Sequence, residues 1–560
     1  MPEKSSPPPV DLEELLEREE GQFGWHQLRV MVLCAVATVC AALSTSEFIF
    51  TSSRVNTRCL IPECESSGSQ QEFAPSWILN AVPSEGDGFA SCERFNSSAA
   101  AADGTCPAAL FDTTTIVDCE QHVYENTDSA VYTLGLACDE WRRSLVGSIR
   151  TTGALVSLPL AGIVSDRWGR RTALAITLVN TGWIGLLRYF ANTYVGFIIS
   201  VFAESAFGSG AIASCCYIMV AESMPRKFRV ATCSLIISFF ATGQVCLGLL
   251  AWALPYWRHL TLVIYAPQLL FLTYFWILPE SNRWYLSKAR YEEAEAGLRR
   301  IAKTNGQQLS EKSLIELRSA AEEQKKRTAE KSSSNEPWLI VLVFQHKKIL
   351  LRCLLTPVWW ITMTLIYYGL SINAVNISGN RYLNYVTVSA VEIPGAWTAM
   401  VLFDRIGRKA VNIGAYWICA ASQIAFIVMP DDMYWASLVV YLVGKYSIAI
   451  VATAVYLYTS ELFPTQHRHR LFGYSSMMGR LGSIVAPLTP ALGTTIWEHL
   501  PFVLFGGMSF ISGLLMLLTP ETRGCRLPDT MEEAEHIGKT DQRQAKPGHR
   551  ASDAEVISRL

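Results

Sequence analysis

Three ionisable residues, Glu392, Lys445 and Arg480, lie inside long apolar runs of this 560-residue chain. A charge within a bilayer is costly unless it faces a cavity or a partner, so each one is a candidate for function. An arginine fork can bind a carboxylate through two hydrogen bonds, and a lysine would add a second positive charge. These residue types therefore indicate a site for a small charged molecule. The alternatives are a structural, snorkelling Arg480 and a Glu392 that pairs with Arg480 or Lys445.

The apolar residues that surround these charges gather into twelve runs. Each run has the length that crosses a hydrocarbon core about 30 Å thick. We therefore predict an all-α membrane protein with twelve transmembrane helices. The runs lie near 28–50, 144–165, 172–191, 196–220, 231–253, 259–278, 349–371, 384–403, 410–429, 434–458, 471–494 and 498–519.

The distribution of charge predicts the orientation in the membrane. The formal net charge of -2 is too small to indicate a nucleic-acid partner. Residues 1–25 are acidic and proline-rich rather than short and basic, which argues against a cleavable signal peptide. Placing both termini in the cytoplasm puts every basic cluster inside and segment 51–143 outside. The clusters are 166–171, Arg226 to Arg229, 283–332, 404–409 and 466–470.

The predicted outer segment contains an even number of cysteines, which indicates a disulfide framework with fifteen possible pairings. The cysteines are Cys59, Cys64, Cys92, Cys106, Cys119 and Cys138. Asn96-Ser-Ser98 is an N-glycosylation sequon in this segment, whereas Asn376-Ile-Ser378 lies close to the end of a membrane helix.

The remaining segments are predicted to be cytoplasmic. Helical spacing of Glu, Lys and Leu predicts surface helices at 291–302 and 310–328. We predict a flexible link at 331–336 and a disordered tail toward residue 560. The resulting organisation is a tail at 1–27, a six-helix half at 28–278, a central loop at 279–348, a second half at 349–519 and a tail at 520–560.

Three motifs recur in the same order at nearly the same offset, which indicates a duplicated unit of six helices. Parallel six-helix halves are the plan of the major facilitator superfamily of transporters. The pairs are Asp166 with Asp404, Glu222/Arg229 with Glu461/Arg468, and Pro279-Glu280-Ser281 with Pro520-Glu521-Thr522.

Further motifs extend the likeness over about 28–530. The chain has a long cysteine-rich first outer segment that ends in Cys138-Asp-Glu-Trp141. It also has Pro279-Glu-Ser-Asn-Arg-Trp284, Glu392-Ile-Pro-Gly-Ala396, Tyr458-Thr-Ser-Glu461-Leu-Phe-Pro-Thr465 and Pro520-Glu-Thr-Arg-Gly524. With these motifs the chain resembles the organic cation, carnitine and organic anion transporter family of that superfamily. Sugar porters share the charged loops but lack the cysteine-rich segment.

This resemblance implies a rocker-switch carrier with one site between its halves. It places arginine at Arg480 and lysine at Lys445 in the anion and carnitine branches, where the cation branch has an aspartate in place of the arginine. It implies cavity roles for Tyr217, Trp360 and Tyr367, whose rings can hold an ammonium. Helix packing and the interfacial belt are the alternatives for these rings. Glu47, Arg150 and Glu204 depart from the family pattern.

The resemblance also implies gating roles for charged residues at the cytoplasmic ends of the helices, with solvated surface ion pairs as the alternative. The expected pairs are Glu222/Arg229, Glu461/Arg468 and Glu280/Arg283. The candidates are Asp166, Arg167, Arg170, Glu222, Arg229, Glu280, Arg283, Asp404, Arg405, Arg408, Glu461 and Arg468.

We therefore predict a plasma-membrane carrier of small organic ions that works by alternating access and prefers carnitine-like zwitterions or organic anions. An organic cation carrier and a non-transporting receptor of the same fold are the alternatives. No nucleophile–base set, Walker loop or HExxH metal motif is present in the sequence. We thus predict neither an enzyme nor a bound metal or cofactor. The motifs leave the coupling ion open.

Overall fold

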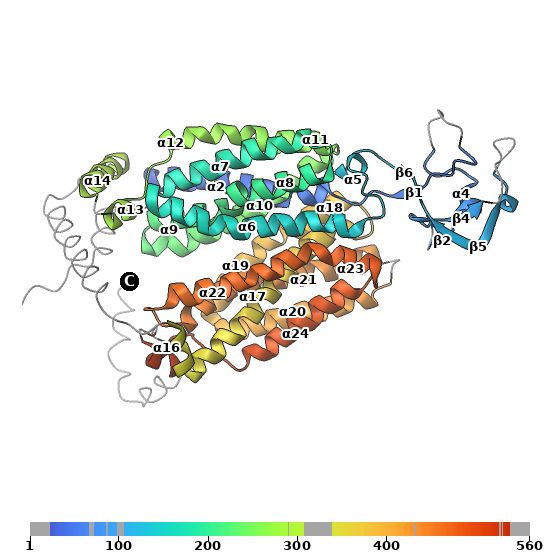
Figure 1. The fold of residues 1–560 in the computed structure, drawn as a ribbon. Helices are drawn as coiled ribbons and strands as arrows, with labels where there is room; N and C mark the ends of the chain where they lie inside the picture. Colours follow the sequence, from blue (N-terminus) through green and yellow to red (C-terminus); the bar gives the residue numbers. More distant parts are fainter. Residues whose placement is uncertain are drawn as a thin grey trace, which may run out of the picture. The chain divides into compact units, whose positions relative to one another are not determined.

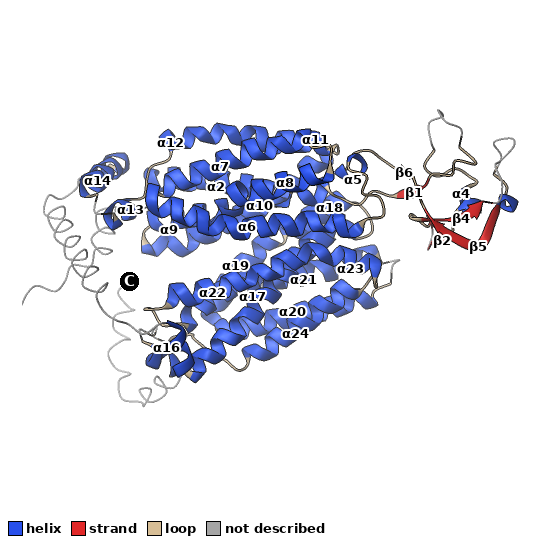
Figure 2. Ribbon diagram, viewed as in Figure 1, coloured by secondary structure: helices blue, strands red, loops and turns tan. Residues whose placement is uncertain are grey.

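The computed structural model describes residues 23–65, 72–85, 88–97, 106–288, 290–306, 339–430, 433–525, 528 and 530–537. Helices dominate this part of the chain, and its strands lie between Thr57 and Tyr124 (Figures 1 and 2). The chain divides into two compact units. Unit 1 comprises Met1–Lys325, Ile372–Ser389 and Pro487–Glu498, and unit 2 comprises Lys326–Ser371, Ala390–Ala486 and His499–Leu560.

Six helical segments of membrane length come from the N-terminal half of the chain and belong to unit 1. Each of the six apolar runs predicted between 28 and 278 falls on one of these segments. They are α2 (Trp25–Ser46) with α3 (Phe48–Thr51), α6 (Glu140–Trp168), α7 (Arg170–Leu187) with η2 (Arg188–Phe190), α8 (Tyr194–Glu204) with η3 (Ser205–Ser209) and α9 (Gly210–Ser223), α10 (Arg226–Ala253), and α11 (Trp257–Tyr265) with η4 (Ala266–Thr273) and α12 (Tyr274–Ile277).

The C-terminal half supplies the other six segments. They are α17 (Lys347–Asn373) with η5 (Ala374–Asn376), α18 (Arg381–Ala390) with α19 (Glu392–Arg405), α20 (Arg408–Val428), α21 (Tyr434–Leu462), α22 (Arg468–Val485) with η6 (Ala486–Leu488) and α23 (Thr489–Thr495), and α24 (Leu500–Met516). Residues 372–389 and 487–498 of this half group with unit 1, so α17 and α18 extend across the boundary between the units.

Ten of the described helical segments are long and apolar enough to cross a membrane, and α24 is a shorter apolar helix. The segment that begins with α22 carries Arg468, Arg470 and Arg480, which lower its mean hydropathy. Helices suit this environment because they satisfy every backbone polar group internally. The predicted all-α fold with twelve transmembrane helices is thereby confirmed.

Short helices lie between and beyond the membrane segments. They are α13 (Asn282–Ser287), α14 (Tyr291–Asn305), α16 (Leu339–Gln345) and α25 (Met531–Glu535). Helix α14 covers the first predicted surface helix. The second one at 310–328, the link at 331–336 and the end of the tail lie outside the described residues.

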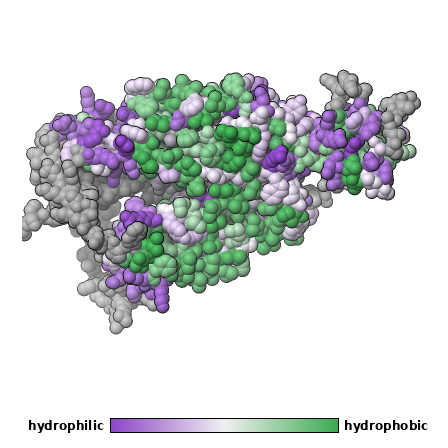
Figure 3. Space-filling view, in the orientation of Figure 1, coloured by the Kyte–Doolittle hydropathy of each residue, from purple (hydrophilic) through white to green (hydrophobic). Residues whose placement is uncertain are grey.

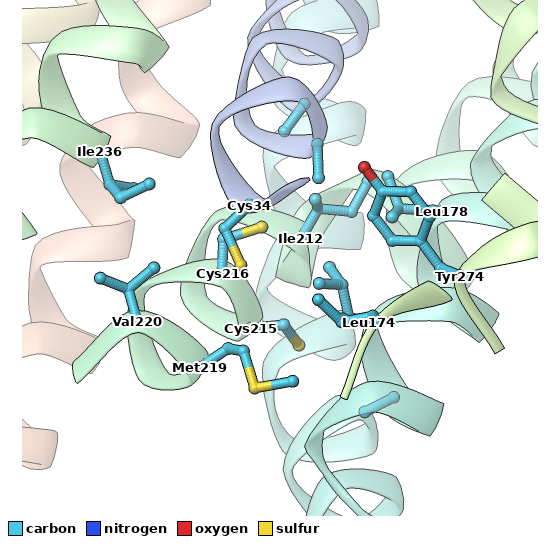
Figure 4. Close-up of a cluster of buried hydrophobic side chains, with 14 of the residues drawn as sticks. Cys34, Leu174, Leu178, Ile212, Cys215, Cys216, Met219, Val220, Ile236 and Tyr274 are labelled. Carbon is cyan, nitrogen blue, oxygen red and sulfur yellow. The ribbon is translucent and has the colours of Figure 1, made fainter. Parts of the chain in front are cut away.

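Small and apolar side chains form the core of the unit 1 bundle. Cys34, Leu178, Ile212 and Cys216 are fully buried and bring α2, α7 and α9 together (Figure 4). On the visible face of unit 1, hydrophobic residues cover the membrane helices, and hydrophilic residues gather on the strand-bearing domain and near α13 and α14 (Figure 3). Lipid-facing helices require this distribution.

The described residues between 52 and 139 form a small domain between α3 and α6, which we name the disulfide domain. Its strands pair antiparallel as β1 (Thr57–Cys59) with β6 (His122–Tyr124), β2 (Ser84–Glu85) with β3 (Gly88–Phe89), and β4 (Glu93–Ser97) with β5 (Phe111–Asp118). The short helices α4 (Ile78–Ala81), η1 (Ala108–Leu110) and α5 (Ala130–Thr133) complete it. The six predicted cysteines pair as Cys59–Cys119, Cys64–Cys106 and Cys92–Cys138.

Two polar residues of the disulfide domain, Glu63 and Asn96, have different surroundings. Burial of Glu63 raises its pKa, but hydrogen bonds from Ser97 and Arg94 outweigh burial and hold the pKa below its usual value. Asn96, the predicted glycosylation residue, lies in β4 with an exposed side chain.

Candidate functional site

Two of the predicted site residues, Glu392 and Lys445, form a buried ion pair in unit 2. Lys445 Nζ lies 2.8 Å from Glu392 Oε1, and their side chains are 0% and 5% exposed. The ammonium also donates to Tyr367 O at 2.8 Å and to Ser371 Oγ at 2.7 Å. The charge of Lys445 is therefore neutralised within unit 2 in this structure.

Tyr367 completes this pair instead of standing apart as a cavity ring. Lys445 Nζ lies 3.9 Å from the centre of the Tyr367 ring, which is a cation–π contact. The Tyr367 hydroxyl donates a hydrogen bond to Glu392. The ring face that the sequence assigned to a substrate ammonium thus contacts the ammonium of Lys445.

Arg480 differs from Lys445 in having no counter-ion among the residues that the structure describes. It lies in α22 with a partly buried side chain, next to Gly479, which packs on Trp360. Among the residues that the structure describes, none forms a hydrogen bond or an ion pair with its guanidinium. The Tyr456 hydroxyl of α21 lies within electrostatic range of Arg480. Within the described part of unit 2, the Arg480 guanidinium is therefore uncompensated.

The other two predicted aromatics have different surroundings. Trp360 is 1% exposed, donates from Nε1 to Thr459 Oγ1 at 3.1 Å, and contacts the Tyr456 ring at 4.5 Å. These contacts match the packing alternative. Tyr217 lies in α9 of unit 1 and is 46% exposed.

Unit 1 contains a second set of membrane charges, which we name the buried charge cluster: Glu47, Arg150, Arg188 and Glu204. All four are at most 2% exposed. Arg188 binds Glu47 directly and lies 3.5 Å from Glu204 Oε2, and Arg150 lies 3.7 Å from the same oxygen. The three residues that depart from the family pattern therefore meet at one place. Arg188 was missed because it stands near the end of its apolar run, where a basic residue resembles an interfacial anchor.

Residues of the first charged loop, between α6 and α7, contact Glu222 of α9 and Glu280, which follows α12. Arg170 Nη1 donates to Asp166 Oδ1 at 2.6 Å, and Arg170 Nε lies 3.1 Å from Glu222 Oε1. Glu280 accepts from the backbone N–H groups of Arg170 and Arg171 at 2.8 and 3.1 Å. Burial raises the pKa of Glu280 above its usual value despite these hydrogen bonds.

The second charged loop repeats this arrangement in unit 2. Glu521 accepts from the backbone N–H groups of Arg408 and Lys409, both at 3.0 Å, and Arg408 Nε lies 3.4 Å from Glu461 Oε2. Gly169 and Gly407, at the turns of the two loops, have φ of +105° and +112°. The duplicated sequence thus folds into a duplicated constellation.

In the second charged loop the observed ion pair differs from the predicted Glu461/Arg468 pair. Glu461 pairs with Arg408 rather than Arg468, whose guanidinium donates to Phe463 O and Thr465 Oγ1. Arg283 Nε donates to Glu222 O at 3.1 Å. The hydrogen bond that Ser281 donates to Glu222 recurs as one from Thr522 to Glu461, both at 2.6 Å. The repeat of Pro-Glu-Ser as Pro-Glu-Thr was the signal for Glu521, Ser281 and Thr522.

The other gating candidates have separate places. Arg167 lies over the ring of Trp168 at 5.4 Å. The exposed Arg405 accepts a hydrogen bond at its backbone oxygen from Arg523 at 2.8 Å. The side chains of Arg229 and Asp404 lie outside those that the structure describes.

At the end of unit 1 that carries the disulfide domain, elements of both sequence halves meet in an aromatic joint, which we define as Phe50, Trp252, Tyr382 and Tyr385. The Phe50 ring stacks on Tyr382 at 5.7 Å and meets Tyr385 edge-on at 5.0 Å. The Trp252 ring is nearly parallel to Tyr382 at 6.3 Å. Residues of α3, α10 and α18 thus hold this end together.

No group of three or more His, Cys, Asp or Glu able to hold a metal ion occurs in the described ranges.

Comparisons with known proteins agree with this architecture. The family described as "Sugar (and other) transporter" matches residues 105–533. The chain is 31% identical to the "Organic cation transporter protein" of Drosophila melanogaster over 93% of this chain and 94% of that one. It is 30% identical to "Solute carrier family 22 member 3" of Rattus norvegicus, covering 94% and 96% of the two chains.

A solved structure shows the same fold at lower identity. The inward open conformation of the xylose transporter XylE from E. coli aligns with a TM-score of 0.58 and 17% identity, over 91% of this chain and 99% of that one. At this identity the likeness concerns the fold alone. The twelve-helix fold, the family match and the full-length relatives together show that the chain is a multi-pass membrane transporter, not an enzyme, and that it belongs to the organic cation, carnitine and organic anion transporter family of the major facilitator superfamily.

Proposed function

We propose that the protein carries small organic anions or carnitine-like zwitterions across the plasma membrane by alternating access, with Arg480 binding the carboxylate of the substrate. The observation that carries this proposal is the contrast between two membrane cations of unit 2. Lys445 is neutralised by Glu392 at 2.8 Å, whereas Arg480 has no counter-ion among the described residues. An arginine fork without a partner is the group that a carboxylate satisfies.

The Glu392–Lys445 pair gives a zwitterion a second point of attachment. A substrate ammonium competes with Lys445 for Glu392, and the Tyr367 ring and hydroxyl belong to the same pair. A zwitterionic substrate would replace the Glu392–Lys445 pair with two pairs of its own, its ammonium with Glu392 and its carboxylate with Arg480. In this proposal Lys445 acts through the pair rather than as a free second cation.

Two features support the topology of this carrier. The charged loops of the two halves repeat one constellation, as two matching halves that alternate between states would require. We propose that these basic loops and both termini face the cytoplasm, which leaves the disulfide domain and Asn96 outside. In that orientation the aromatic joint lies at the outer end of unit 1.

An organic cation carrier is the second candidate, favoured by the names of the relatives. For this chemistry Glu392 would have to release Lys445 before it could bind a substrate ammonium. A buried lysine left without its acid is costly, and a simple cation, unlike a zwitterion, brings no carboxylate that could offset this cost by binding Arg480.

The test compares uptake by wild type, Arg480→Ala and Arg480→Lys in cells at matched surface expression. Labelled carnitine-like zwitterions, aromatic carboxylates and quaternary ammonium ions are the probes. A charge-assisted hydrogen bond contributes about 1.5–3 kcal/mol, so Arg480→Ala should reduce carboxylate uptake roughly ten- to 150-fold. Carboxylate uptake by Arg480→Lys should lie between that of wild type and that of Arg480→Ala, because lysine keeps the charge but loses the planar guanidinium fork. Arg299→Ala, on the surface helix α14, is the matched control and should change nothing.

The opposite results are equally clear. Wild type that prefers simple cations, with Arg480→Ala unimpaired, would replace this proposal with the cation carrier. The absence of uptake of every probe at good surface expression would favour a receptor that keeps the fold.

A further inference from the structure

Glu204 is the member of the buried charge cluster whose charge is least well satisfied. It is the last residue of α8, directly before the π-helical turn η3, and it is 0% exposed. Neither of its carboxylate oxygens accepts a hydrogen bond from any described residue. Its contacts with Arg188 and Arg150, at 3.5 and 3.7 Å, are longer than hydrogen bonds to a carboxylate. Single-turn π-helices are often found at functional sites.

The other acid of the cluster is fully bound. Glu47 accepts from Thr261 Oγ1 at 2.9 Å, from the Tyr265 hydroxyl at 3.2 Å, and from Arg188. Of the two acids of the cluster, Glu204 is therefore the one whose carboxylate oxygens have no hydrogen-bond donor among the described residues.

The two arginines direct their donors elsewhere. Arg150 Nη2 donates to Ser44 O at 2.7 Å and to Ser209 Oγ at 2.8 Å. Arg188 Nη1 donates to the Tyr265 hydroxyl at 3.1 Å and to Glu47. Arg188 Nη2, like both oxygens of Glu204, has no hydrogen-bond partner among the described residues. Arg188 and Glu204 are therefore close to each other but share no hydrogen bond.

We infer that Glu204 is a proton-binding site of this transporter. The carboxylate takes one proton from hydronium, becomes a neutral carboxylic acid and releases water. The cluster then changes from net neutral, with two arginines and two carboxylates, to a net charge of +1. The groups that face Glu204 are Arg150 of α6, Arg188 of η2, and Tyr265 of α11 with Glu47 behind Arg188.

The chain links this proton site to the aromatic joint. Arg188 contacts both Glu204 and Glu47, and Glu47 directly precedes α3, which carries Phe50 of the joint. Protonation of Glu204 leaves Glu47 as the only carboxylate paired with Arg188 among the described residues. This step rests on the proposed function. Proton binding at Glu204 shifts the aromatic joint and thereby couples organic-ion transport to a proton gradient.

Infrared difference spectroscopy on purified wild type tests proton binding without any substrate. Acidification should produce a carboxylic acid C=O band that is absent in Glu204→Gln. The band should remain in the control Glu140→Gln, because Glu140 pairs with Arg143 at the start of α6, away from the cluster. Glu204→Asp should shift the band, which keeps the test decisive if Glu204→Gln does not fold. The same unshifted band in wild type and both Glu204 variants would overturn the inference.

Proteoliposomes then test coupling separately from the proposed function. The probe is a labelled quaternary-ammonium carboxylate, whose charge does not change near neutral pH, with the membrane potential clamped. Wild type should exchange it at equilibrium and accumulate it up to about ten-fold per pH unit of gradient. In Glu204→Gln exchange should persist, but the inside-to-outside concentration ratio of the probe under the pH gradient should fall to about one.

The outcomes separate the two claims. Accumulation that persists in Glu204→Gln, or wild-type exchange that ignores the gradient, would overturn the coupling inference but leave the carrier in place. An absence of wild-type exchange would overturn the proposed function, and the infrared band would still decide whether Glu204 binds a proton.

Discussion

Replacing one partner of the Glu392–Lys445 pair should destabilise the protein far more than replacing both. In Lys445→Met the carboxylate of Glu392 keeps, among the described residues, only the hydrogen bond from the Tyr367 hydroxyl. Both side chains are at most 5% exposed, so water cannot compensate the lost charge. Breaking a buried pair in this way costs about 3–5 kcal/mol, whereas replacing both members by neutral groups of similar volume is often neutral.

The two single variants should differ because the two residues differ in their other contacts. In Glu392→Gln the ammonium retains Tyr367 O, Ser371 Oγ and the Tyr367 ring. Glu392→Gln should therefore lose about 3 kcal/mol of unfolding free energy, and Lys445→Met should lose about 5 kcal/mol. The double variant Glu392→Gln/Lys445→Met should recover most of this stability, which a double-mutant cycle reports as coupling.

Equilibrium unfolding of the purified protein in mixed micelles measures these differences. Glu293→Gln is the matched control, because the Arg290–Glu293 pair is exposed on α14 and should give no detectable change. Additive losses in the double variant would refute the reasoning, since independent side chains show no coupling. Membrane helices would then hold these two charges without mutual dependence.

The remaining predictions concern the charged loop and the disulfide domain. Gly169→Ala should destabilise the protein by about 1–3 kcal/mol, because φ is +105° and the new Cβ would overlap the Glu280 carboxylate, whereas Gly162→Ala, in open space on α6, should not destabilise it in the same unfolding assay. The folded pKa of Glu63 is lowered, so its contribution is complete above the unfolded value of 4.5 and is lost as pH falls through the folded value. Protease cleavage of the disulfide domain in the full chain should therefore increase on acidification, and Glu63→Gln should weaken that dependence. Asn96→Gln should remove a glycan and increase gel mobility, and an unchanged mobility would contradict an outer location for this domain.

The sequence by itself determined the features that depend on local composition. Apolar runs of bilayer length specify membrane helices because each helix satisfies its own backbone, so the twelve helices needed no knowledge of their neighbours. The three repeated motifs revealed the duplication, and six cysteines in one segment indicated the disulfide framework. Arg480 stood out because its guanidinium lies well inside an apolar run, where a charge is costly unless it faces a cavity or a partner.

Only the tertiary structure decided which groups meet. Sequence reasoning left Glu392 with two possible partners, and the rotation of α19 against α21 brings Lys445 to it. The disulfide pairing likewise follows from how the strands pair. Arg188 joined Glu47 and Glu204 because η2 turns an apparent helix-end anchor into the bundle. Hydropathy is a property of each segment alone, whereas pairing depends on the rotation and depth of each helix against its neighbours, which packing sets.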